Sequence, residues 1–277
     1  MSTTYCYPLF DTHCHLDLPE LAGDLTPHWQ AAKAACVAAI LIPATEAARW
    51  PLLIELAALL RQQPAAPQIA LALGIHPWWA ESWQPGQLEL LEMMLQQQPD
   101  VCAVGEIGLD FATDWHDDPA ALQQQQLQLF RQQLDIASSH QKPVILHHRK
   151  SQPALLAALK AARFQQGGIL HAFSGSQAQA HAFLDLGFKL GIGGTITYQR
   201  ALKTRQTVSK LPIDALVLET DAPSIPLCGF QGQVNTPAQL LRVLQALATL
   251  RGEPVAELAT LLWRNSLAAL RLDLLDW

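Results

Sequence analysis

The stretch PVILHHRKSQPALLAALKAARFQQGGILHA, residues 143–172, contains two short apolar runs separated by one amphipathic segment. The runs at 143–147 and 168–172 are apolar almost throughout, as is typical of parallel strands that are buried on both faces. Between them, 151–163 has apolar residues at helical spacing and a proline near its start, so it predicts a helix. This strand–helix–strand unit predicts a parallel sheet that is covered by helices.

The same alternation recurs along the chain. Further apolar runs lie at 7–12, 37–42, 69–74, 101–106, 188–192 and 215–219. Helical spacing is clear at 119–140, and we expect the last helices, 236–250 and 253–272, to pack outside the barrel and close it. Eight strands alternating with helices predict an α/β fold, a (β/α)8 TIM barrel. A doubly wound open sheet is the alternative, but the first strand is not followed by a glycine-rich phosphate turn.

Composition predicts one domain with a large core. The chain has 277 residues, 50% hydrophobic and 15% charged, and it lacks a linker or an internal repeat, so we expect one domain over 1–277. Apolar stretches such as 37–42 are too short to span a bilayer, and the N-terminus lacks the features of a secretory signal. The cysteines are odd in number and scattered, at positions 6, 14, 36, 102 and 228. We therefore expect reduced thiols and a cytoplasmic location.

The charge distribution bears on nucleic-acid binding. A formal charge of −6 argues against a protein that coats duplex DNA, but it leaves room for an enzyme that takes a nucleic-acid end into a pocket. One segment, 186–213, is basic and has no acidic residue. Its cations are Lys189, Arg200, Lys203, Arg205 and Lys210. We interpret this run as a solvated helix face, although cations lining the barrel mouth would favour a nucleic-acid substrate.

The first strand ends in a pair of histidines, in the motif Asp11-Thr12-His13-Cys14-His15. Side chains two positions apart on an extended chain point the same way, so His13 and His15 face one centre and Cys14 faces away. Imidazole pairs of this kind suit a zinc-type ion. Packing alone also produces such pairs, so the other strand ends decide the interpretation.

Four more strands end in polar residues of the same kind. Glu106 follows the fourth strand, and His147, His171 and Asp221 follow the fifth, sixth and eighth. A carboxylate next to a buried strand is costly unless it is paired or binds a cation. Barrel enzymes build their sites at the carboxyl ends of the strands, which is where all these residues lie. Together with the first histidine pair they predict a site for two divalent ions, Zn, Mn, Ni or Mg, with Glu106 giving one oxygen to each.

These motifs resemble those of the TatD family of metal-dependent deoxyribonucleases, within the amidohydrolase-like barrel superfamily, and are most like its YjjV-type members. The matching stretches are 11–15, Gly74-Ile75-His76-Pro77, 105–110, His147-His148-Arg149, 171–175 and 219–223, with Asn235 and Asn265 further on. The resemblance implies that one metal is held by His13, His15, Glu106 and Asp221, and the second by Glu106, His147 and His171. Many relatives have basic residues after the eighth strand, whereas 229–235 is uncharged here.

This site predicts a metal-dependent hydrolase acting on ester bonds. Two cations lower the pKa of bound water from about 15.7 towards about 7, and Asp221 is the best candidate to take the proton, with Glu106 as the shared carboxylate. Arg149 could bind a phosphate and His76 could contact substrate, although each could equally be structural. Asp110 is interpreted as a loop cap or as an acceptor behind the ligands.

These residues are compatible with three functions. We expect a phosphodiesterase or deoxyribonuclease that acts on nucleic-acid ends, without a membrane or an obligate protein partner. The alternative is a two-metal hydrolase of a small ester, amide or acyl-nucleotide with no nucleic-acid role. A non-catalytic metal-binding protein is disfavoured because every ligand and the candidate base Asp221 are retained.

Overall fold

The centre of the molecule is a barrel of eight parallel strands in sequential order. The computed structural model describes residues 6–23, 25–63 and 66–273. The strands are β1 (Leu9–Asp11), β2 (Val37–Pro43), β3 (Gln68–Leu73), β4 (Val101–Asp110), β5 (Val144–Arg149), β6 (Gly168–Leu170), β7 (Phe188–Ile192) and β8 (Leu216–Leu218). The barrel closes between β8 and β1, where the Thr12 amide donates to the Leu218 carbonyl at 2.9 Å. The predicted TIM barrel is confirmed.

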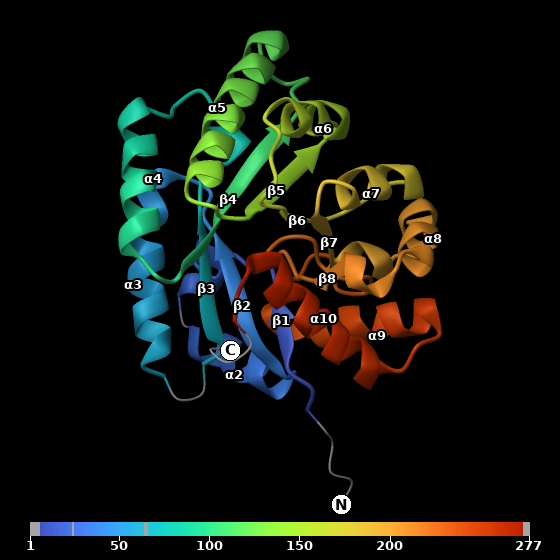
Figure 1. Ribbon diagram of the computed structural model, residues 1–277. Helices are drawn as coiled ribbons and strands as arrows, with labels where there is room; N and C mark the ends of the chain where they lie inside the picture. The colour runs from blue at the N-terminus through green and yellow to red at the C-terminus, as the bar shows by residue number, and fades with distance from the viewer. Residues whose placement is uncertain (1–5, 24, 64–65, 274–277) are drawn as a thin grey trace, which may run out of the picture.

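Helices surround the strands on the outside (Figure 1). They are α1 (Pro19–Ala22), α2 (Leu25–Ala34), α3 (Trp50–Arg61), α4 (Pro85–Gln97), α5 (Pro119–Ser139), α6 (Gln152–Ala161), α7 (Gln177–Leu184), α8 (Leu202–Lys210), α9 (Leu240–Arg251) and α10 (Val255–Leu270). Proline occupies one of the first two positions of α3, α4, α5 and α6, where its missing N–H costs no hydrogen bond. Among the described residues, no helix is both long and apolar enough to cross a membrane.

The last helix packs outside the strands and closes one end of the barrel, as expected. The second residues of β1, β5 and β8 (Phe10, Ile145 and Val217) belong to a buried cluster that also contains Leu267 and Leu270 of α10. The Trp263 ring of the same helix lies 5.8 Å from the Phe10 ring. The end of α10 therefore covers the amino-terminal end of the barrel, because apolar strand starts need an apolar cover. The carboxyl ends of the strands are left for polar groups.

The expectation of reduced thiols is wrong for one pair of cysteines. Cys6 and Cys36 form a disulfide, with a Cα–Cα distance of 5.6 Å. Cys6 precedes β1 and Cys36 precedes β2, and the Leu9 amide donates to the Cys36 carbonyl at 2.8 Å, so pairing of these strands brings the two residues together. The other three cysteines, at positions 14, 102 and 228, are free thiols.

Candidate metal centre

The ends of β1 and β8 are fixed to each other by a buried carboxylate. Asp11 accepts hydrogen bonds from the Thr220 amide at 2.9 Å and from the Thr220 hydroxyl at 2.6 Å. The Asp221 amide donates to the His13 carbonyl at 2.9 Å, which sets Asp221 beside the first histidine pair. Burial raises the pKa of Asp11 to about 7, against the effect of the Thr220 hydrogen bonds. Asp11 therefore positions two predicted ligands, a role that the sequence did not reveal.

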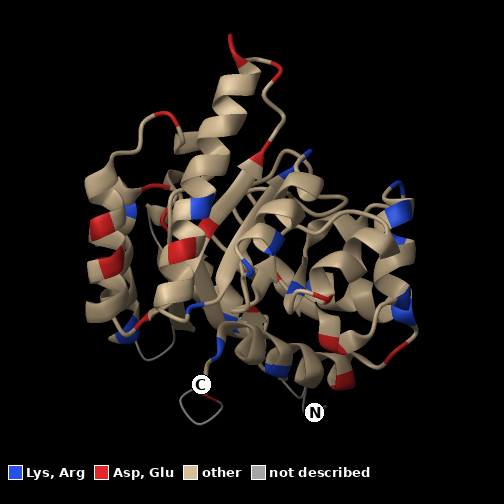
Figure 2. Ribbon diagram, turned by 45° about the horizontal axis from the view of Figure 1, so that its top comes forward, with Lys and Arg blue, Asp and Glu red and all other residues tan. Residues whose placement is uncertain are grey.

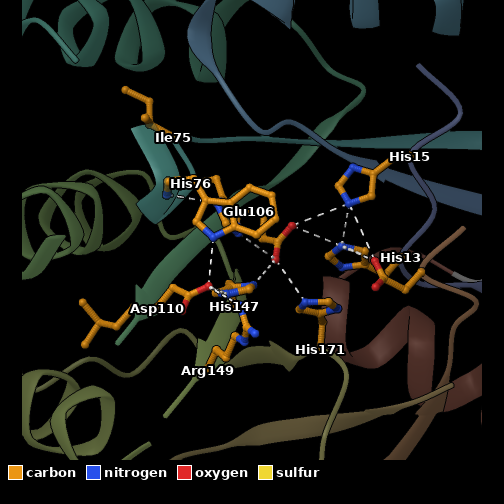
Figure 3. Close-up of polar contacts among 12 residues, drawn as sticks. His13, His15, Ile75, His76, Glu106, Asp110, His147, Arg149 and His171 are labelled. Carbon is orange, nitrogen blue, oxygen red and sulfur yellow. Dashed lines mark hydrogen bonds and ion pairs between the residues drawn. The ribbon is translucent and has the colours of Figure 1, made fainter. Parts of the chain in front are cut away.

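Glu106 lies at the centre of the site, between two groups of histidines (Figure 3). Its Oε2 atom is 3.3 Å from His13 Nε2 and 3.7 Å from His15 Nε2. Its Oε1 atom is 3.0 Å from both His147 Nδ1 and His171 Nε2. The two oxygens of one carboxylate thus face different sets of imidazoles, and the side chain itself is almost fully buried.

The donor atoms fall into three overlapping groups, each with its ligand atoms within 4.8 Å of one another. The groups are His13, Glu106 and His171; His13, His15 and Asp221; and His76, Glu106 and His147. The structure thus brings all six predicted ligands to one place. It also brings His76 there, with Nε2 at 3.7 Å from Glu106 Oε1, although the sequence suggested a substrate contact for it. Its position after the third strand, in Gly74-Ile75-His76-Pro77, is the signal that could have placed it among the donors.

The geometry of the first histidine pair fits a cation. His13 Nε2 and His15 Nε2 face each other at 3.2 Å, and both also point towards Asp221 Oδ1, at 3.7 and 3.8 Å. The Nδ1 atoms of both rings are buried and have no hydrogen-bond partner. The Nε2 atoms and the carboxylate oxygen therefore converge on one point. Imidazole nitrogens and carboxylate oxygens are the ligands that a borderline divalent ion prefers.

Burial and charge compete strongly at this site. Burial disfavours ionisation of Glu106, but the surrounding imidazoles, above all His171 and His13, outweigh it and hold the pKa of Glu106 well below its usual value. Burial likewise disfavours the charged form of His171, but Glu106 outweighs it and raises the pKa of His171 to about 10. Burial raises the pKa of Asp221, and His171 and His15 only partly offset this. These shifts are those of a concentrated, buried set of charges.

Asp110 links the centre to its surroundings. Its Oδ2 atom accepts a hydrogen bond from Trp78 Nε1 at 2.8 Å and lies 3.3 Å from His147 Nε2, while Oδ1 accepts from the Ala112 amide at 3.0 Å. Burial acts against ionisation, yet the His147 and Trp78 hydrogen bonds lower the pKa of Asp110 to about 2. Asp110 is therefore both the loop cap and the acceptor behind a histidine that the sequence offered as alternatives.

Arg149 stands at the mouth of the site. Its side chain is 63% exposed, and its Nη1 atom is 4.0 Å from Asp110 Oδ2, too far for a close ion pair. It lines a cavity of about 560 Å³ together with Lys150 and Lys203. Lys150 pairs with Asp114 at 2.9 Å, and Lys203 donates to the Gln179 side chain at 3.3 Å. Three cations thus line one cavity, together with His148, the residue that follows the predicted ligand His147.

Most of the basic run 189–210 lies elsewhere. Lys189 donates to the Asp214 carbonyl, Arg205 donates to the Ile196 carbonyl, and the Arg200 guanidinium lies over the Tyr198 ring. Of this run, only Lys203 lines the cavity that contains Arg149. Figure 2 shows positive and negative residues interspersed along the ribbon. The interpretation as a helix face holds for Lys203, Arg205 and Lys210, which lie on α8. It is wrong for Lys189, which lies in β7, and for Arg200, which precedes α8.

A barrel with this buried histidine and carboxylate cluster is that of a metal-dependent hydrolase. The chain belongs to the TatD family, since the family described as TatD related DNase matches residues 10–271. The chain is 45% identical over 257 residues to YjjV of Escherichia coli (strain K12), named an uncharacterized metal-dependent hydrolase, covering 92% of this chain and 95% of that one. The family resemblance expected from the motifs is confirmed.

A solved structure and one further relative support the fold and the enzyme class. The crystal structure of YjjV, a TatD homologue from Escherichia coli K12, matches with a TM-score of 0.88 and 41% identity, covering 97% of this chain and all of that one. A protein of Klebsiella pneumoniae (strain 342), named 3'-5' ssDNA/RNA exonuclease TatD, is 35% identical over 186 residues, covering 65% of this chain and 68% of that one. The predicted hydrolase class is therefore confirmed.

Proposed function

We propose that this enzyme is a phosphodiesterase that hydrolyses the ends of single-stranded nucleic acid with two divalent cations. The observation that carries the proposal is the cavity lined by Arg149, Lys150 and Lys203. Arg149 links it to the donor cluster, because its guanidinium lies 4.0 Å from Asp110, which contacts the predicted ligand His147. The protein has a net negative charge, so a few clustered cations favour a polyanion that contacts the enzyme at only a few phosphates. The activity named for the Klebsiella pneumoniae relative supports the same choice of substrate.

We assign the donors to two metal positions that share Glu106. His13, His15, Asp221 and Glu106 Oε2 would hold one ion, and Glu106 Oε1, His147 and His171 would hold the other, with His76 next to the second. Two such ions, whether Zn, Mn, Ni or Mg, would supply an acidified water and stabilise the charge that develops on the phosphate. The convergence of Nε2 atoms on both Glu106 oxygens supports this assignment.

Side chains of the protein carry out proton transfer and substrate binding. Asp221 accepts the proton of the attacking water and passes it to the leaving oxygen, a role that suits a buried carboxylate whose pKa is raised by burial. Arg149 binds a phosphate oxygen pair with its exposed guanidinium and so orients the substrate. The proposal also includes one domain over 1–277 and an enzyme that needs no obligate protein partner. The Cys6–Cys36 disulfide removes the argument from reduced thiols for a cytoplasmic location.

A substrate screen on metal-loaded enzyme tests this function. The enzyme is loaded separately with Zn, Mn and Mg, and metal content is measured before each assay. Labelled single strands with free ends are compared with circular single strands and with strands blocked at either end, beside a panel of small esters and amides. We expect free ends to be cut and circular or blocked strands to be poor substrates. A fully loaded enzyme that hydrolyses a small ester or amide but no nucleic-acid end would establish the small-molecule alternative instead.

A further inference from the structure

A second cavity adjoins the donor cluster on the other side of Arg149. It measures about 350 Å³, and its lining includes Trp78, Asp110, Trp115, Leu122 and Arg149. The two tryptophans are 67% and 73% exposed. Large aromatic side chains that are this exposed commonly mark a binding surface when they share one cavity. The catalytic assignments above leave both tryptophans without a role.

The first tryptophan ties the cavity to the metal centre. Trp78 belongs to the short helix η2 (Pro77–Trp79), and its amide donates to His76 Nδ1 at 3.1 Å. Its ring nitrogen donates to Asp110, which in turn contacts His147. The ring centres of Trp78 and His147 are 6.4 Å apart. A group held against this indole therefore lies directly beside the predicted ligands.

The second tryptophan comes from the loop before α5. Trp115 Nε1 donates to the Ala112 carbonyl at 3.0 Å, and its ring meets the His116 ring edge-on at 5.6 Å between centres. His116 in turn contacts Glu81, another lining residue, at 3.1 Å. Because the ring nitrogens of both indoles are already bonded within the protein, the indoles offer a ligand their flat faces and no hydrogen bond.

We infer that this cavity binds the nucleobase of the nucleotide next to the bond that is cut. Stacking on aromatic faces accepts any base, because every base has a π-face. The exposed carboxylate of Glu81 can accept a hydrogen bond from an exocyclic amino group, and Arg149 lines both this cavity and the cationic one. The base would thus lie on one side of Arg149 and the neighbouring backbone phosphate on the other. The inference rests on the proposed nucleic-acid substrate and adds a subsite to it.

Trp115 allows the sharper test, since Trp78 also supports Asp110. Trp115→Ala, Trp115→Phe and the control Trp79→Ala are assayed on two single strands that differ only in having a normal or an abasic terminal nucleotide. Trp79 is an exposed tryptophan of η2, the short helix that also contains Trp78, but it does not line the cavity. We expect Trp115→Ala to raise KM for the normal end by about 5- to 150-fold, with kcat and metal content retained. Trp115→Phe should restore most of the loss, and the abasic end should show no difference between the variants and the parent.

A binding measurement separates failure of this subsite from failure of the proposed function. Calorimetric titration of the metal-loaded enzyme with deoxycytidine monophosphate and with deoxyribose 5-phosphate measures the contribution of the base without cleavage. The subsite is supported if the parent binds the nucleotide more tightly than the sugar phosphate and Trp115→Ala loses this difference. This result supports the subsite even when no strand is cut. Cleavage of strand ends with equal KM values for the parent and Trp115→Ala on the normal end would overturn the subsite and leave the nuclease proposal intact. Equal affinity of the parent for the two small ligands would also overturn it.

Discussion

Replacing Arg149 by alanine should weaken the salt dependence of substrate binding without changing the metal content. Three cations, Arg149, Lys150 and Lys203, line one cavity, and Lys150 is already paired with Asp114. We therefore expect the parent enzyme to neutralise about two or three phosphates of a single strand, at about 0.7 in logarithmic slope for each. Its affinity should fall about 7- to 18-fold between about 50 and about 200 mM salt, against about 3- to 7-fold for Arg149→Ala.

Fluorescence anisotropy with a labelled single strand measures these slopes. The enzyme is loaded with a cation that does not support turnover, and metal content is checked at each salt concentration. Lys160→Ala is the matched control, because Lys160 is exposed in the last turn of α6, which runs back to the amino-terminal end of the barrel. The control should keep the slope of the parent. An Arg149→Ala enzyme whose slope and activity equal those of the parent would refute the phosphate-binding role.

Three further changes test other parts of the account. Asp221→Asn should lower kcat by about 10²- to 10⁴-fold while most of the metal stays bound, because the amide keeps an oxygen but accepts no proton; near-parental turnover at full metal content would assign the base elsewhere. Asn265→Ala should destabilise the fold by about 1–3 kcal/mol for each carbonyl left without a donor, and urea unfolding with an unchanged midpoint would contradict this. The carbonyls concerned are those of Ile213 and Leu216, at 2.7 and 2.8 Å from Asn265 Nδ2. Chelation should lower the melting temperature, since cations at about 100 times their Kd stabilise the fold by about 2.7 kcal/mol. An unchanged melting temperature after addition of the chelator would exclude tight metal binding in the core.

The barrel could be predicted because its strands are short apolar runs with helical segments between them. The run expected at 37–42 became β2 (Val37–Pro43), and the helix expected at 119–140 became α5 (Pro119–Ser139). Barrel geometry then places every strand end at one edge, so six polar residues far apart in sequence could be expected to meet. This part of the site follows from strand register alone.

Other features depend on packing that no local pattern encodes. The pairing of Cys6 with Cys36 follows from the adjacency of β1 and β2, and the cover formed by α10 depends on which apolar surface the barrel leaves open. The cavity between Trp78 and Trp115 is built by two loops whose conformations are set by individual hydrogen bonds, to Asp110 and to the Ala112 carbonyl. Sequence shows that tryptophans are present at these positions but not that they share a cavity.

The shared role of Glu106 is the central claim, and metal content tests it most directly. Its two oxygens lie 3.0–3.7 Å from imidazole nitrogens of both predicted positions, so one substitution removes a ligand from each. Metal per chain is measured by mass spectrometry after equilibrium dialysis against Zn, for the parent, Glu106→Ala and the control Glu81→Ala, with circular dichroism to verify folding. We predict two ions per chain in the parent and the control, and none or one loosely held ion in Glu106→Ala. Two tightly bound ions in folded Glu106→Ala would contradict the claim.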